Sequence, residues 1–350
     1  MPVVPTVVPT AVSPSVPPDA AMMDLALAAA RSCRLVTSPN PWVGCVIHTA
    51  KGLCTGATSP PGENHAEINA LAACGPLAKG AHLYTTLEPC SHTGRTGPCV
   101  EAIIAAGIAR VSVAIEDPDP QVCGRGIAAL RAAGIQVDVG TRADETTQLL
   151  APYIKHRRTG LPWVVLKLAA TLDGRIAAPD ASSRWITGEA ARSDAHCLRA
   201  ESDAVLVGAG TIRADDPQLT VRHWQPAVGI APRTKQPRRV VLGAVSASAR
   251  VQPATQMSGP LPEVLASLGS EGVMQLLVEG GASTAAAFHR AGLVDHYVIY
   301  LAPALFGGSD AHPMFSGAGA ASIDNLWRGE IVGTTYLGAD LRIDLRPASV

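Results

Sequence analysis

Short apolar runs alternate along the chain with longer segments whose apolar residues recur every three or four positions. The first pattern predicts buried strands, and the second predicts helices that pack one face against a sheet. In the first part of the chain, the predicted strands span Trp42–Ile47, His82–Thr86, Arg110–Ile115 and Ile135–Val139. The predicted helices of this part span Met22–Arg34, His65–Cys74, Pro98–Ala106 and Ile127–Ala133. This alternation predicts an α/β layered fold.

A second series of elements follows a basic, turn-prone stretch that contains Lys155-His156-Arg157-Arg158. Its predicted strands span Trp163–Leu168, Ala204–Val207, Arg239–Leu242, Met274–Val278 and His296–Leu301. Its predicted helices span Glu189–Ala200, Pro262–Leu268 and Ser283–Ala291. A chain of 350 residues is long enough for two domains of roughly 150 residues each. The sequence therefore predicts two α/β domains.

The domain boundaries follow changes in composition. The first 18 residues carry no charge and six prolines, so residues 1–19 predict a disordered tail and not a secretory signal. The first domain is then expected over residues 20–150, a basic linker over 151–160 and the second domain over 161–350.

Composition narrows the class of protein. A chain that is 47% apolar and 16% charged is globular, and it lacks the run of about 18 apolar residues that a membrane span needs. A net charge of −1 and an aromatic content of 4% argue against a nucleic-acid-binding surface. Eight cysteines do not form a disulfide scaffold in a chain of this length, so we expect a protein of the reducing cytoplasm.

Three residues of the first domain have the chemistry of a catalytic zinc site. His65 lies at the start of a predicted helix, and Cys90 and Cys99 follow about 25 and 34 residues later. One histidine and two cysteines are the ligands of an open zinc site, with water in the fourth position. Glu67 is a poor ligand for so soft a site and is placed to carry protons, as in zinc deaminases. A closed structural zinc site or a chance cluster remains the alternative.

The second domain contains a turn suited to an anion. Glu279-Gly280-Gly281 follows a predicted strand, and Ser283-Thr284 begins the next helix. Glycines, hydroxyls and a helix N-terminus together favour anion binding, although an ordinary strand-to-helix turn has the same pattern. Residues 151–240 carry 14 basic against 8 acidic residues, which fits either a solvated surface or a site for phosphorylated ligands.

The order of the motifs in both domains carries a family resemblance. The motifs of the first domain are Pro39-Asn40-Pro41, His65-Ala66-Glu67, Thr86-Leu87-Glu88-Pro89-Cys90 and Asp117-Pro118-Asp119-Pro120. Those of the second domain are Leu172-Asp173-Gly174-Arg175, Leu198-Arg199-Ala200, Asp215-Asp216-Pro217 and Glu279-Gly280-Gly281. Over about residues 20–340 they resemble the RibD family, the bifunctional deaminase/reductases of riboflavin biosynthesis.

For the first domain, the resemblance implies a cytidine-deaminase-like three-layer α/β/α fold that binds Zn²⁺ through His65, Cys90 and Cys99, with Glu67 as the catalytic residue. Its substrate would be 2,5-diamino-6-(ribosylamino)pyrimidin-4-one 5′-phosphate, which loses its 2-amino group as ammonia. The implied substrate-binding residues are Asn40, His92 and Arg95. Two residues depart from the family pattern, namely Asn69 in place of histidine and Asp119 in place of asparagine.

For the second domain, the resemblance implies a dihydrofolate-reductase-like α/β fold in which NADPH reduces 5-amino-6-(5-phosphoribosylamino)uracil. The implied substrate-binding residues are Ser183, Arg199, Asp215, Leu219, Arg222 and Glu279. The implied cofactor-binding residues are Lys167, Ala170, Trp185, Thr211, Asp215, Gly280, Gly281, Ser283 and Thr284. Gly243 replaces the usual aspartate, and the irregular stretch Val245–Gly259 predicts that one strand-helix step is missing from the sheet edge.

Two other functions stay open at this point. The chain could be a nucleoside or nucleic-acid deaminase with an unrelated second domain, or an active deaminase fused to a degenerate reductase domain. The resemblance favours small phosphorylated pyrimidines as the partners, with no nucleic acid and no membrane. It also implies a homodimer or a larger oligomer formed through the second domain.

Overall fold

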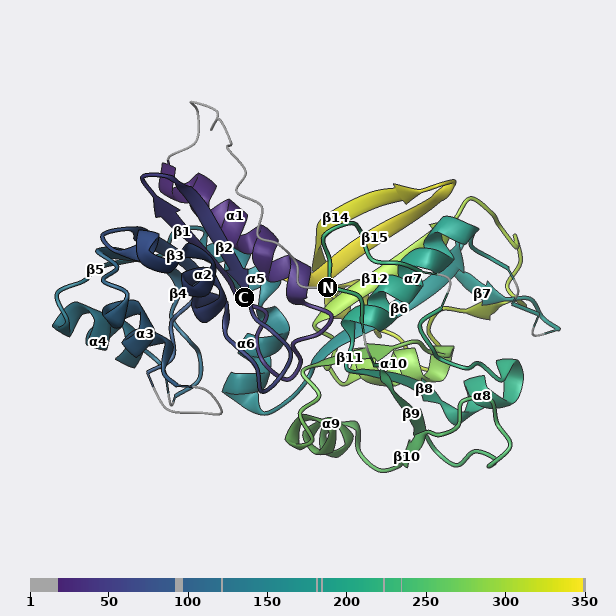
Figure 1. Ribbon diagram of the computed structural model, residues 1–350. Coiled ribbons are helices and arrows are strands. Elements are labelled where there is room, and N and C mark those ends of the chain that lie inside the picture. Colours follow the sequence, from purple (N-terminus) through teal and green to yellow (C-terminus); the bar gives the residue numbers. More distant parts are fainter. Residues whose placement is uncertain are drawn as a thin grey trace. The chain divides into compact units, whose positions relative to one another are not determined.

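The structure is a computed structural model, and it describes residues 18–91, 97–120, 122–180, 182–183, 185–222, 224–233 and 235–348 (Figure 1). These residues form two compact units. The first unit comprises the described residues up to Thr159 together with 226–233, and the second comprises the remainder. Residues 1–17 of the predicted tail lie outside the described residues, whereas Pro18 and Asp19 begin the first helix.

The first unit is built on a five-stranded sheet with the order β2-β1-β3-β4-β5. Its strands are β1 (Gly44–Thr49), β2 (Gly52–Ala57), β3 (His82–Leu87), β4 (Arg110–Ile115) and β5 (Gln136–Val139). Strand β1 pairs antiparallel with β2 and β3, and the β3–β4 and β4–β5 pairs are parallel. The sequence predicted four of these strands and missed β2, because its small and polar residues lack a continuous apolar run.

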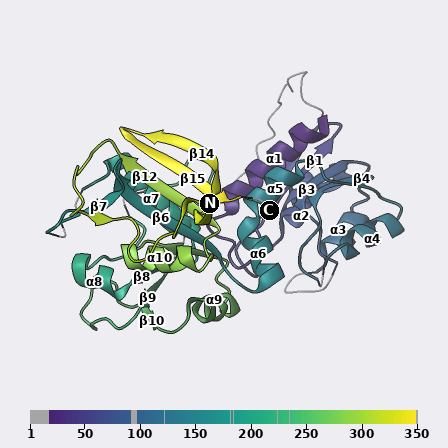
Figure 2. The ribbon, with the colours of Figure 1, turned by 180° about the vertical axis from the view of Figure 1, so that it is seen from behind.

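Helices cover both faces of this sheet. The helices of the unit are α1 (Pro18–Cys33), α2 (Ala66–Cys74), α3 (Cys99–Ala105), α4 (Arg125–Ala132), α5 (Ala143–Leu149) and α6 (Ala151–Thr159). A side chain at Gly44 would collide with the backbone of α1, and one at Gly56 with that of α2. Cys45 pairs with Gly56, so Gly44 and Gly56 face opposite sides of the sheet. The predicted three-layer α/β/α arrangement is therefore confirmed, and α1 runs along the sheet in both views (Figures 1 and 2).

The stretch 151–160 differs from the expected linker. Residues 151–159 form helix α6, which belongs to the first unit. Tyr153 is buried there, and its hydroxyl donates hydrogen bonds to the carboxylate of Asp117. The basic residues of α6 gave the segment the composition of a hinge, while the buried tyrosine fixes it to the unit.

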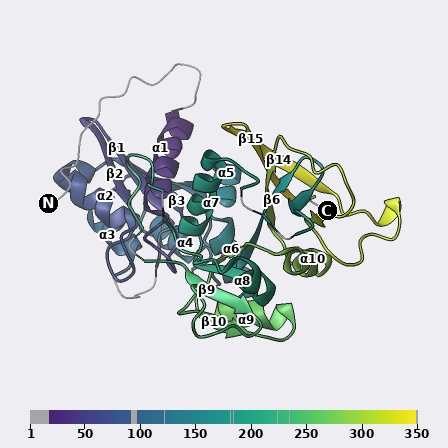
Figure 3. The same cartoon turned by 90° about the vertical axis from the view of Figure 1, so that its right-hand side faces the viewer.

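The second unit is built on an eight-stranded sheet with the order β10-β9-β8-β11-β6-β12-β15-β14. Its strands are β6 (Trp163–Thr171), β8 (Ala204–Gly208), β9 (Arg238–Leu242), β10 (Thr255–Met257), β11 (Gln275–Val278), β12 (His296–Ala302), β14 (Gly329–Leu337) and β15 (Asp340–Pro347). The pairs from β10 to β12 are parallel, and β15 and β14 add antiparallel at the other edge. Figure 3 shows this last pair at the end of the sheet. A small separate sheet joins β7 (Arg175–Ala177) to β13 (His312–Pro313).

Apolar clusters lie on both faces of the large sheet, one around Phe288 and the other around Ile212. The helices are α7 (Glu189–Glu201), α8 (Ala209–Asp215), α9 (Leu261–Ser270) and α10 (Ala282–Arg290). The expected loss of a whole strand-helix step was wrong in part, because β10 is present and pairs with β9. Only the helix is missing, since residues 243–254 contain turns and bends.

No helix within the described residues is both long and apolar enough to cross a bilayer.

Candidate active sites

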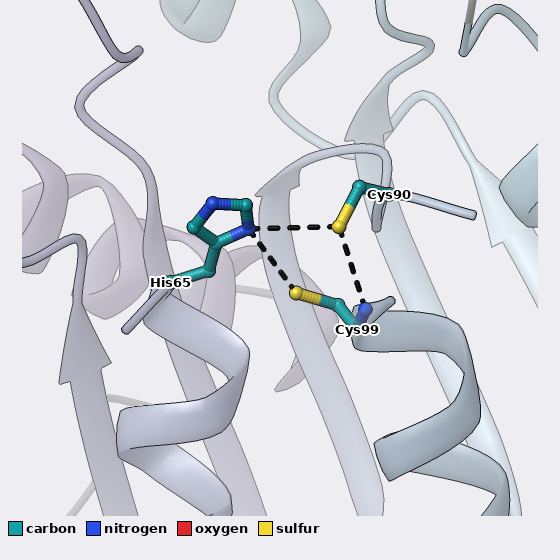
Figure 4. A group of neighbouring side chains, drawn as sticks. All are labelled: His65, Cys90 and Cys99. Carbon is teal, nitrogen blue, oxygen red and sulfur yellow. Dashed lines mark hydrogen bonds between the residues drawn. The ribbon is translucent and has the colours of Figure 1, made fainter. Parts of the chain in front are cut away.

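His65, Cys90 and Cys99 come together at the ends of three elements of the first unit. His65 immediately precedes α2, Cys90 follows β3, and Cys99 is the first residue of α3. The Nδ1 atom of His65 lies 3.6 Å from the Sγ atom of Cys90 and 3.3 Å from that of Cys99 (Figure 4). Among the described residues, this is the one group of three or more histidine, cysteine, aspartate or glutamate side chains whose ligand atoms all lie within 4.8 Å of one another.

The donor set fits a zinc ion. Ligand atoms on a tetrahedral zinc with ordinary Zn–S and Zn–N bonds lie roughly 3.3–3.8 Å apart, which matches these separations. Hydrogen bonds from Cys99 and His65 lower the pKa of the Cys90 thiol, and the Cys99 backbone N–H lies 3.4 Å from its sulfur. The residues thus supply a thiolate, an imidazole and a second thiol, and they leave a fourth position open.

Glu67 stands beside the cluster in the first turn of α2. It is 3% exposed, and its Oε2 atom lies 3.6 Å from the Sγ atom of Cys99. Burial raises the pKa of Glu67 to about 7. A carboxyl group with a pKa near the operating pH can both accept and release a proton.

A cavity of about 320 Å³ opens over this cluster. Its lining includes His65, Glu67 and Cys90, and Asn40 contributes from the turn before β1. Cys99 belongs to the cluster but not to the lining, since it is fully buried. The predicted substrate residues His92 and Arg95 lie outside the described residues.

Three further lining residues of this cavity were not predicted from the sequence as site residues. Asp117, Tyr153 and Arg157 all line it. Burial raises the pKa of Asp117 to about 6. The Nε atom of Arg157 lies 4.0 Å from a carboxylate oxygen of Asp119. Asp119, the residue that departs from the family pattern, therefore has a cation beside it. Asp117 and Asp119 stood within a quoted motif, but nothing in the sequence joined them to α6.

Asn69, the other residue of this domain that departs from the family pattern, does not line the cavity. Its side-chain amide donates to the Ala57 carbonyl at 2.8 Å and to the Ser59 hydroxyl at 3.0 Å. Asn69 therefore ties α2 to the end of β2.

The second unit has a larger cavity of about 560 Å³. Ten predicted residues line it, namely Lys167, Ser183, Trp185, Arg199, Thr211, Asp215, Arg222, Glu279, Gly280 and Gly281. Four residues that the sequence had not singled out, Arg192, His196, Arg250 and Tyr300, line it as well.

Arg199 and Glu279, which both line this cavity, form an ion pair that is largely buried. Arg199 donates to both carboxylate oxygens of Glu279, and its Nη2 atom lies 2.8 Å from Oε2. Burial alone would raise the pKa of Glu279, but the charge and hydrogen bonds of Arg199 hold it below its ordinary value. Burial lowers the pKa of the neighbouring Lys167. Glu279 is thus kept as an anion.

The glycine turn lies against α8. The N–H of Gly281 donates to the Thr211 hydroxyl at 2.8 Å. Gly280 has a φ of +91°, which favours glycine, and a Cβ atom on Gly281 would lie 3.2 Å from the same hydroxyl oxygen. The backbone conformation of the turn therefore favours glycine at Gly280, and a side chain at Gly281 would require the Thr211 hydroxyl to shift.

Four predicted residues of the second unit do not line its cavity, namely Ala170, Leu219, Ser283 and Thr284. Ala170 and Leu219 are buried, and Ser283 hydrogen-bonds Ser316 at 3.0 Å. The Thr284 hydroxyl is packed against Gly208, where an added Cβ atom would lie only 2.5 Å from it.

Comparison with known proteins also divides the chain into two regions, one for each cavity. Residues 17–115 match the cytidine and deoxycytidylate deaminase zinc-binding region, and residues 162–341 match the RibD C-terminal domain. The chain is 39% identical over 360 aligned residues to the riboflavin biosynthesis protein RibD of Bacillus amyloliquefaciens, covering 93% of this chain and 95% of that protein. The chain belongs to the RibD family. A RibD protein of Mycobacterium tuberculosis is 41% identical, with 92% of this chain and 96% of that protein covered.

Solved structures of RibD proteins have the same fold. Acinetobacter baumannii RibD superposes with a TM-score of 0.88 at 36% identity, covering 95% of this chain and 99% of that chain. A deaminase/reductase from Thermotoga maritima gives 0.81 at 29% identity, covering 94% and 99%. The chain is therefore a bifunctional deaminase/reductase of riboflavin biosynthesis, with a zinc-binding deaminase domain and an NADPH-using RibD reductase domain.

Proposed function

We propose that the two cavities perform consecutive steps on one phosphorylated pyrimidine. The first removes the 2-amino group of 2,5-diamino-6-(ribosylamino)pyrimidin-4-one 5′-phosphate, and the second reduces 5-amino-6-(5-phosphoribosylamino)uracil to its ribitylamino product. The observation that carries this proposal is the buried Glu67 beside a His-Cys-Cys cluster in a cavity large enough for a pyrimidine.

In the deaminase cavity, His65, Cys90 and Cys99 hold the zinc. A zinc ion in such a site supplies an activated water, because it lowers the pKa of that water to about 7. Glu67 accepts a proton from the attacking water and gives one to the leaving amine, which its raised pKa permits. Asn40, His92 and Arg95 contact the substrate, and the guanidinium of Arg95 can hold its phosphate.

In the reductase cavity, the residues of the chain bind and orient the substrate and NADPH, and NADPH supplies the hydride. Arg199 and Arg222 face the substrate phosphate, and Asp215 and Glu279 accept hydrogen bonds from its hydroxyl and amino groups. The cofactor is held by Lys167, Trp185, Thr211 and the turn Gly280–Gly281. We keep Ala170, Leu219, Ser283 and Thr284 as supports of this cavity and not as contacts, since they do not line it.

The proposed domain boundaries are residues 20–159 for the deaminase and 160–350 for the reductase, with α6 assigned to the deaminase and residues 226–233 grouped with it in the structure. We also propose that the reductase unit forms a homodimer or a larger oligomer. Strand β14 is exposed at the edge of the sheet, and Ile331, Val332 and Tyr336 are its exposed apolar residues. Eight free cysteines support a reducing compartment, the cytoplasm.

Product analysis tests the proposed reactions. Purified zinc-loaded protein is incubated with the diaminopyrimidine substrate, first without and then with NADPH, and the products are identified by mass spectrometry. We expect the deaminated ribosylamino compound alone in the first sample and the ribitylamino compound in the second. An unchanged substrate in both samples would refute the proposed substrate.

A further inference from the structure

We propose that Glu88 is a positioning residue of the deaminase site. Its carboxylate holds the described residues of the segment 117–127, three of which line the substrate cavity, against the turn that leads to Cys90. This inference deepens the proposed function and rests on it, since the cavity is taken to bind the pyrimidine substrate.

The carboxylate of Glu88 accepts four backbone hydrogen bonds from one segment. Its Oε2 atom receives the N–H groups of Asp117 at 3.1 Å and Gly124 at 2.9 Å. Its Oε1 atom receives those of Gly126 at 2.8 Å and Ile127 at 3.2 Å. Glu88 is 3% exposed, so these bonds form away from bulk water. Charge-assisted bonds of this kind are stronger than neutral ones.

The same contacts bring α4 directly against the turn before Cys90. A Cβ atom at Gly126 would lie 2.1 Å from the Pro89 carbonyl oxygen and 3.1 Å from the Glu88 carboxylate. The first turn of α4 therefore rests on the backbone of Pro89 and the carboxylate of Glu88. Its free N–H groups are bound by an anion, as the partial positive charge of a helix N-terminus favours.

The segment that Glu88 holds supplies part of the cavity. Asp117 and Val122 line it, and so does Asp119. Asp117 continues the connection by accepting the hydroxyl of Tyr153 from α6. Glu88, which itself lines the cavity, thus links the turn before Cys90 to these lining residues, and its loss should weaken substrate binding more than it slows the chemical step.

Glutamine is the sharpest substitution at this position. Glu88→Gln keeps the length of the side chain, but one oxygen becomes an amide that donates and cannot accept, so two of the four N–H groups lose their acceptor. Glu88→Asp keeps the charge but shortens the side chain by one methylene group. This variant provides the test if the glutamine variant does not fold. The matched control is Glu116→Gln, an exposed glutamate one residue before the same segment.

Each variant is measured for bound zinc, for kcat and KM of deamination, and for backbone hydrogen exchange over residues 117–127. For Glu88→Gln we expect about one equivalent of zinc, a KM raised by roughly tenfold or more with kcat changed much less, and faster exchange confined to that segment. Glu88→Asp should show the same pattern more weakly, and Glu116→Gln should match the unmodified protein.

Two results would overturn the proposal. One is an unchanged KM and unchanged exchange with zinc retained. The other is joint loss of zinc and kcat, which would mean that Glu88 acts through Cys90 and not through the segment 117–127. Failure of the proposed function is distinguishable, because the unmodified protein would then not turn over the substrate, while hydrogen exchange would still report whether Glu88 holds the segment.

Discussion

The two cavities each contain a buried carboxylate, and their surroundings give these groups opposite properties. Glu67 lies beside sulfur atoms, and burial raises its pKa to about 7. Glu279 is largely buried, with 9% of its side chain exposed, but the Arg199 guanidinium holds its pKa below the ordinary value. The first carboxylate can therefore exchange protons near neutral pH, whereas the second remains charged. The same residue type serves proton transfer in one unit and binding in the other.

The comparison extends to how each site is assembled. The deaminase residues occupy the ends of β3, α2 and α3, all within one short stretch of chain. The reductase pair joins α7 to the turn after β11, 80 residues apart. Because the two cavities share no lining residue in the part of the chain that the structure describes, changes in one should leave the chemistry of the other intact.

The largest effect is expected from removing a zinc ligand. Cys90→Ser should abolish zinc binding and deamination together, because a hydroxyl is a much poorer ligand for zinc than a thiolate. The reductase activity should persist when deaminated substrate is supplied. Metal analysis and the two separate assays check this, with the exposed Cys123→Ser as the control. Full zinc content with normal deamination would remove Cys90 from the site.

Glu67→Gln should preserve zinc and lower the deaminase kcat by about 10²–10⁴-fold, the usual contribution of general acid-base catalysis. Glutamine keeps the shape of the side chain and cannot carry the proton. The exposed Glu101→Gln in α3 is the control. Retained turnover in Glu67→Gln would assign proton transfer to another group.

Arg199→Ala should affect only the reductase unit. It should raise the reductase KM by roughly tenfold or more and destabilise the unit, because Glu279 would be left buried without its cation. Deamination should be unchanged, and the exposed Arg213→Ala should change neither activity. Steady-state kinetics of both reactions and thermal unfolding check this. An equal loss of both activities would contradict the independence of the two sites.

The smallest effect concerns Asp119, where the family pattern has asparagine. Arg157 lies beside this carboxylate on a half-exposed wall, so Asp119→Asn should lower the deaminase KM by at most about fivefold. When the changes in KM are expressed as free energies, the change in the double variant with Arg157→Ala should differ from the sum of the two single changes. Additive effects would show that the two side chains act separately.

The local parts of this structure were predictable from the sequence. The zinc cluster was predicted from its residue types, one histidine and two cysteines, and from the positions of His65 and Cys99 at predicted helix starts. Strand β14 was missed because its exposed residues do not alternate with buried ones, and β10 has only three residues. Such elements are defined by their pairing with a neighbouring strand, which a single sequence does not reveal.

Contacts between distant residues were not predictable. Tyr153 was assigned to a linker, but it lines the deaminase cavity and donates a hydrogen bond to Asp117, so α6 borders that cavity. In the reductase unit, Ala170 of β6 was expected to contact the cofactor, but it is fully buried and does not line the cavity, whereas Ala169 beside it does.

The central claim is that one chain performs both reactions in two independent cavities, and a coupled assay tests it most directly. Purified protein receives the diaminopyrimidine ribosylamine phosphate and NADPH, and ammonia release and NADPH absorbance are followed in the same sample. We predict ammonia and a matching loss of NADPH, with Glu67→Gln abolishing both signals and Arg199→Ala retaining ammonia while slowing NADPH loss. Ammonia release without any NADPH loss in the unmodified protein would contradict the claim.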